Sequence, residues 1–99
     1  MQLGFMLDNI SIAILTKVNE LAERHGLNPY DFVASVRDVE GAAILAFEIP
    51  ASGNRVREDR FDKMLQDLGV NEGVLKAKCS HIIDALDNAL QLSPKPRLR

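Results

Sequence analysis

The chain has 99 residues and a formal net charge of −2, with 46% hydrophobic and 26% charged residues. These values suit one globular domain and exclude wholesale disorder. Positive and negative residues are nearly balanced, so no overall field would attract nucleic acid or anionic lipid, and such binding would need a local patch. With four Phe, one Tyr and no Trp, the core must be mainly aliphatic.

Redox and targeting features favour an intracellular protein. A single cysteine, Cys79, leaves no internal disulfide, and nothing indicates an oxidising compartment. The N-terminal residues MQLGFMLDN lack the basic region and cleavage pattern of a signal peptide. The longest strongly apolar run, Ile10–Leu15, is too short to span a bilayer. We therefore expect a cytoplasmic protein that does not bind membranes.

The first predicted element is a helix over residues 8–25. Leu7, Ile14 and Leu21 repeat every seven residues, which places them along one side of a helix of about five turns. Gly26 follows this pattern and suits the left-handed conformation that is common just past a helix end.

Residues 31–50 fit two periodicities, and the fold class depends on which one holds. Leu45, Phe47 and Ile49 alternate with other residues up to a terminating proline, which predicts a strand, and residues 38–41 have the chemistry of a hairpin turn. A helical period also fits part of the segment, through Phe32, Val33, Val36 and Val39. We favour the hairpin because the alternation continues cleanly to the proline.

Two further helices are predicted, over residues 58–68 and 72–90. Their apolar stripes are Phe61, Met64, Leu65 and Leu68 in the first, and Leu75, Cys79, Ile82, Leu86 and Ala89 in the second. Joined around Gly69, they would form an αα-hairpin. The arrangement resembles a helix-turn-helix, but Leu65 and Lys78 stand where small and apolar residues are expected, so an ordinary αα-hairpin is favoured.

The predicted architecture is α+β, in the order helix, two-stranded antiparallel β-hairpin, helix, helix, and the alternative is an all-α bundle. Residues 1–92 would form a single compact domain, and residues 93–99 a flexible basic tail. The helices would pack on one hairpin face, which is built from Phe32, Ala34, Val36, Leu45, Phe47 and Ile49.

This hairpin predicts self-association. A lone two-stranded sheet is marginally stable, and both of its edges offer unpaired backbone groups. Its second face would also carry Val33, Ile44 and Ala46, which are apolar. Pairing of two hairpins across a two-fold axis would satisfy both needs, so we expect a homodimer with these three residues as the candidate interface.

Residues with reactive side chains do not form a recognisable site. Cys79 and His81 are the nearest pair of metal-ligand type, but a structural zinc usually needs four ligands, and the only other histidine is His25. Cys79 lies on an apolar stripe, which is the reverse of the polar setting of a nucleophile. Acidic residues fall on outward helix positions. We therefore expect no metal, cofactor or catalytic site.

Basic residues gather where the predicted loop 51–57 enters the helix over 58–68. They are Arg55, Arg57, Arg60 and Lys63, a candidate site for an anion or a protein partner because arginine offers planar paired donors. Acidic residues are interleaved with them, namely Glu58, Asp59 and Asp62. That interleaving favours local ion pairs over a functional patch.

The leading functional hypothesis is a small noncatalytic interaction or regulatory protein that binds itself and an unidentified protein. The alternative is a nucleic-acid-binding accessory protein that uses the arginine cluster and the basic residues of 95–99. An enzyme ranks third, because no acid, base and nucleophile are grouped in the chain. That ranking would change if the fold brought His25 and His81 into one pocket.

Overall fold

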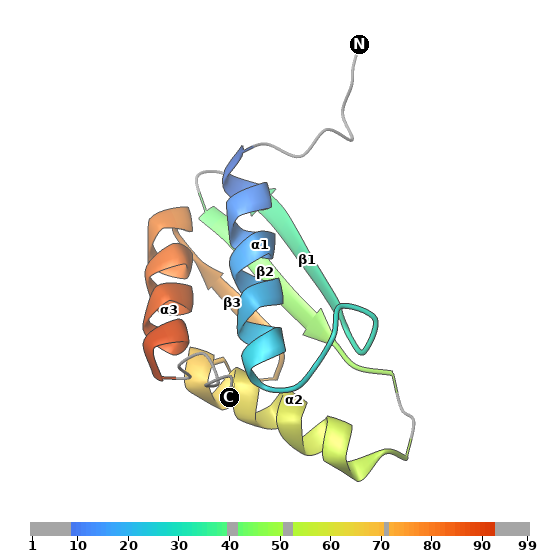
Figure 1. Ribbon diagram of the computed structural model, residues 1–99. Helices are drawn as coiled ribbons and strands as arrows, with labels where there is room; N and C mark the ends of the chain where they lie inside the picture. The colour runs from blue at the N-terminus through green and yellow to red at the C-terminus, as the bar shows by residue number, and fades with distance from the viewer. Residues whose placement is uncertain (1–8, 40–41, 51–52, 71, 93–99) are drawn as a thin grey trace.

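The computed structural model describes residues 9–39, 42–50, 53–70 and 72–92. Its elements in chain order are α1 (Asn9–Arg24), β1 (Val33–Val39), β2 (Ala42–Glu48), α2 (Arg55–Leu68), β3 (Val74–Ala77) and α3 (Cys79–Leu92). Helices α1 and α3 lie side by side over one face of a three-stranded antiparallel sheet, and α2 crosses one end of it (Figure 1). The predicted α+β class and the order helix, strands, helix, helix are confirmed. The predicted tail, residues 93–99, lies outside the described residues.

The segment that fitted two periodicities is a hairpin. Strands β1 and β2 pair antiparallel from Val33 opposite Glu48 to Val39 opposite Ala42. The burial of β2 alternates along its length, as expected for a strand with one covered face. Phe32, Leu45 and Phe47 are buried, and the other predicted inner-face residues, Ala34, Val36 and Ile49, pack against the core. The helical alternative and its all-α bundle are therefore wrong.

A third strand stands where the sequence predicted the start of the last helix. Residues Val74–Ala77 form β3, which pairs antiparallel with β2, and α3 begins only at Cys79. The chain turns into β3 through Glu72 and Gly73, whose φ angles are 58° and 75°. These left-handed conformations do not continue a right-handed helix. The predicted helix over 72–90 is thus wrong in its first seven positions, and so are the αα-hairpin and the helix-turn-helix, because a strand separates α2 from α3.

Gly73 is a structural requirement of this turn. Its carbonyl oxygen accepts a 2.7 Å hydrogen bond from the Phe47 amide, which extends the pairing of β2 with β3. A Cβ atom at Gly73 would stand 2.8 Å from the Phe47 carbonyl oxygen. Only glycine allows the two backbones to approach so closely.

The boundaries of α2 follow from its capping residues. The Asn54 side chain accepts a 3.1 Å hydrogen bond from the Arg57 amide, so the helix begins at Arg55, within the predicted loop. At the other end Gly69 has a φ of 77°, and the Val70 amide donates to the Leu65 carbonyl oxygen. This left-handed conformation ends α2 at Leu68, the end that the sequence predicted.

The core lies between the sheet and the three helices. Its fully buried members include residues of α1, β2, α2 and α3, namely Ile14, Val18, Leu21, Leu45, Met64, Ile82 and Leu86. Phe32, Phe47 and Phe61 meet at the α2 end, with ring centroids 6.0–6.4 Å apart. Aromatic rings at this spacing attract one another in addition to the apolar area that they bury. The three rings therefore hold α2 against the sheet.

Polar contacts join α1 to its two neighbouring helices. Lys17 Nζ lies 2.7 Å from Asp87 Oδ1, and Arg24 donates to the Leu90 carbonyl oxygen, both on α3. His25 Nε2 lies 3.2 Å from Asp67 Oδ2 on α2, where both side chains are largely buried. These contacts set α1 and α3 parallel to each other, with α2 across the end of α1 (Figure 1).

Truncation of Phe61 tests the role of the aromatic cluster. We expect Phe61→Ala to lower the free energy of unfolding by about 3–5 kcal/mol, the usual range for a buried phenylalanine. Val56→Ala removes an exposed side chain of the same helix and should change it by less than about 0.5 kcal/mol. Urea unfolding followed by circular dichroism measures both. Equal effects of the two substitutions would contradict the stabilising role of the aromatic cluster.

Glycine substitutions separate backbone strain from steric contact in the turn before β3. Gly69 and Gly73 have nearly the same φ, but only Gly73 has a backbone atom in the space of an added Cβ. Gly69→Ala should therefore cost about 1–2 kcal/mol, the penalty of a left-handed conformation alone. Gly73→Ala should cost at least about 1 kcal/mol more, because the Phe47 carbonyl must also move. Chemical denaturation of both variants gives the difference, and a value near zero would be inconsistent with the close approach.

Candidate functional site: the uncovered sheet face

One face of the sheet has none of the described helices over it. Both α1 and α3 lie on the opposite face, and α2 crosses the end of the sheet (Figure 1). We call this uncovered surface the outer sheet face. By strand alternation and pairing it consists of Val33, Ser35, Arg37, Ala42, Ile44, Ala46, Glu48, Val74 and Lys76.

The outer sheet face has an apolar centre. Ile44 and Ala46 are half-buried on the central strand, and Val33 and Val74 beside them are 57% and 50% exposed. The structure thus brings together all three residues of the predicted dimer interface, Val33, Ile44 and Ala46. Val74 was missed because the sequence placed it in a helix. In the structure β3 alternates between exposed and half-buried residues, as expected for a strand with one covered face.

Charged residues of opposite sign lie at two different positions along the strands of this face. Strand pairing sets Arg37, Ile44 and Lys76 side by side, so the two cations flank the isoleucine. Glu48 stands four residues further along β2, at roughly 13 Å from Ile44 for an extended strand. The face therefore has a basic end and an acidic end.

The edges of the sheet differ from the prediction. A free hairpin would expose both of its edges, but β3 pairs with the second edge of β2 within the same chain. Unpaired edges remain on β1 and β3 of the described sheet. The dimer prediction therefore no longer draws support from a free edge of β2, and it stands as a prediction that rests on the uncovered apolar face.

Two of the four residues of the predicted anion patch contact groups of the same chain. Arg57 Nε lies 3.3 Å from Asp31 Oδ1, and Arg60 Nη1 donates a 3.1 Å hydrogen bond to the Gly26 carbonyl oxygen. Both arginines thus tie α2 to the turn between α1 and β1. Arg55 and Lys63 are exposed. Arg57 pairs with Asp31. The sequence had suggested a partner among the acidic residues of α2 itself.

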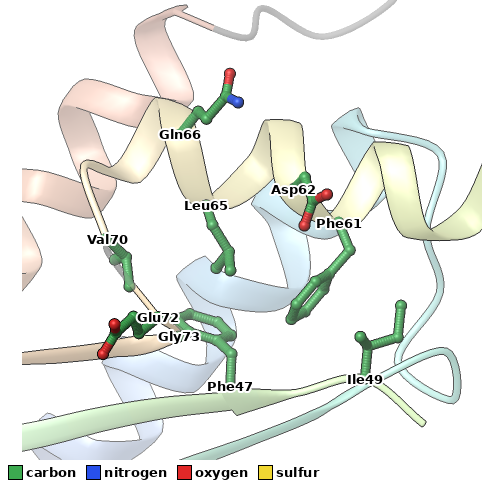
Figure 2. A pocket seen from close by; sticks show the side chains of 9 residues that line it. All are labelled: Phe47, Ile49, Phe61, Asp62, Leu65, Gln66, Val70, Glu72 and Gly73. Atoms are coloured by element: carbon green, nitrogen blue, oxygen red, sulfur yellow. The ribbon is translucent and has the colours of Figure 1, made fainter. Parts of the chain in front are cut away.

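An open depression of about 470 Å³ lies between α2 and the ends of β2 and β3. Its lining residues are Phe47, Ile49, Phe61, Asp62, Leu65, Gln66, Val70, Glu72 and Gly73. Figure 2 shows Asp62 and Glu72 at opposite ends of an apolar floor. The lining contains no histidine, cysteine, serine or lysine, and the two carboxylates do not face each other. This arrangement offers no acid, base and nucleophile set.

The two histidines lie apart. His25 follows α1 and pairs with Asp67, whereas His81 is exposed in the first turn of α3. Because α1 and α3 run parallel, these positions lie at opposite ends of the molecule (Figure 1). Within the described ranges, no group of three His, Cys, Asp or Glu side chains could hold a metal ion.

No protein family, curated protein or solved structure matches this chain. Among the described residues, no helix is both long enough and apolar enough to cross a membrane. The functional interpretation therefore rests on the chain's own surfaces. Of these, the outer sheet face combines exposed apolar side chains with charges placed at defined positions.

Removal of the Arg60 side chain tests its structural role. Arg60→Ala loses the hydrogen bond to Gly26, so we expect the free energy of unfolding to fall by about 0.5–1.5 kcal/mol. Lys63→Ala on the same helix should leave it within about 0.5 kcal/mol of the native value. Thermal and urea unfolding measure both. If Arg60→Ala is as neutral as Lys63→Ala, Arg60 is free to serve as part of an anion site.

Proposed function

We propose that this protein is a small noncatalytic interaction protein that acts through protein–protein contacts as a homodimer. The outer sheet face is the contact surface in this proposal. The supporting observation is the group formed by Val33, Ile44, Ala46 and Val74, which lie together on a sheet face that no described helix covers. Packing against a second sheet would remove this apolar area from water.

The size of the face sets the strength of association. Two strands of seven residues and one of four, at ordinary rise and spacing, give a surface of at most roughly 23 by 14 Å. This area is smaller than the roughly 800 Å² that each partner buries in a standard specific interface, and association also costs translational and rotational freedom. We therefore expect dimerisation at micromolar protein concentrations or above, with exchange between subunits.

The nucleic-acid alternative has less support. Two of its arginines, Arg57 and Arg60, contact groups of the same chain. The outer sheet face also carries no aromatic side chain, and single-stranded nucleic acids bind sheets largely by stacking on such rings. Its basic tail, residues 95–99, lies outside the described residues. The regulatory role, the second protein partner and the cytoplasmic location remain parts of the proposal.

A charge at the centre of the outer sheet face tests the proposed contact. Ile44→Asp replaces an apolar side chain of the proposed contact by a carboxylate that must lose water when the faces meet, so we expect the dimer to dissociate while the far-ultraviolet circular dichroism stays native. Val74→Asp, on a half-exposed position, should act in the same way with less risk to folding. Sedimentation equilibrium across about 1–300 µM measures the association.

Val56→Asp is the matched control, because Val56 is similarly exposed on α2 and far from the outer sheet face. It should dimerise like the native chain. A native protein that stays monomeric up to the highest concentration would refute the proposed dimer. So would folded variants at Ile44 and Val74 that associate normally.

A further inference from the structure

The charged residues of the outer sheet face form a pattern that a second copy can complement. Arg37 on β1 and Lys76 on β3 stand on either side of Ile44, as strand pairing requires. Glu48 lies further along β2 on the same face. All three side chains are exposed, and in the described part of the chain none of them takes part in a salt bridge.

Two arrangements bring two such faces together across a two-fold axis in the plane between them and keep the strands of both sheets aligned. When the axis is parallel to the strands, residues at the same position along the strands face each other. Glu48 then meets Glu48 of the partner subunit, and Arg37 meets Lys76 of the partner subunit. Both contacts juxtapose like charges, which is unfavourable in a partly desolvated interface.

With the axis perpendicular to the strands, the order of residues along one sheet is reversed against the other. An axis at Ala46 lies midway between Ile44 and Glu48 on β2. It therefore places Glu48 over Ile44 of the partner subunit, between the two cations that flank that isoleucine. The contact forms twice, once at each end of the interface.

We propose that the second copy packs in this reversed orientation, with Glu48 of each subunit held between Arg37 and Lys76 of the partner subunit. The inference rests on the proposed dimer and specifies its geometry. Such charges fix orientation and register more than they raise affinity.

The residues at the axis are compatible with close approach of the sheets. Strand pairing sets Ser35, Ala46 and Val74 in one row across the three strands. In the reversed orientation each of them faces its own counterpart, so small side chains oppose small side chains. No large residue at the centre keeps the two sheets apart.

Charge reversal on separate copies tests the orientation. The first variant is Glu48→Lys, and the second combines Arg37→Glu with Lys76→Glu. Each variant alone would place like charges together at both ends, so its dimer dissociation constant should rise at least about tenfold. An equimolar mixture can form a mixed dimer that restores both contacts. The lysine introduced at position 48 of the first variant meets the two glutamates introduced in the second. The native Glu48 of the second variant meets the native Arg37 and Lys76 of the first.

The mixture should therefore associate within about threefold of the native affinity, and high salt should weaken the defect of each single variant. Asp59→Lys and the double variant Arg55→Glu with Lys63→Glu carry the same changes in net charge on α2. Both controls should dimerise like the native chain. Sedimentation velocity and native mass spectrometry, which separates the mixed dimer by mass, are the readouts.

The outcomes separate this inference from the proposed function. If the native chain dimerises but the mixture of reversed variants stays monomeric, the orientation is wrong and the dimer remains. The same holds if either reversed variant dimerises normally. A native chain that never dimerises overturns both.

Discussion

The burial of one face of β2 beneath α1 and α3 is the interaction on which the rest of the structure depends. Ala43, Leu45 and Phe47 are at most 6% exposed, and they belong to one hydrophobic core with fully buried residues of both helices. Because successive strand residues point to opposite sides, this one-sided burial also fixes which side chains remain outside. The core and the outer sheet face are therefore two consequences of the same strand alternation.

The turn into β3 determines how broad that outer surface is. Gly73 brings β3 against the edge of β2, so Lys76 stands beside Ile44 and Val74 beside Ala46. Without this strand the face would lack half of its basic end and one of its exposed valines. A second copy packed against the face would cover apolar area that the three helices, all engaged elsewhere, leave in water.

The sequence could predict whatever depends on local periodicity. Alternation through Leu45 and Phe47 predicted the hairpin and its covered face, and therefore also the uncovered position of Ile44. The sequence could not predict β3. Leu75 lies in the strand and Cys79 begins the next helix, but the two are four residues apart, which is also the spacing of a helical stripe. Partners distant in the chain, such as Asp31 for Arg57, have no local signal at all.

Intermolecular nuclear Overhauser effects between isotope-labelled and unlabelled copies of the native chain test most directly whether the outer sheet face contacts a second copy. At a concentration where the protein is dimeric, the methyl groups of Ile44, Ala46 and Val74 should show intermolecular effects, with Ala46 to Ala46 and Val74 to Val74 contacts among them. Effects confined to helical residues, or a monomer at every concentration, would contradict the proposed interface.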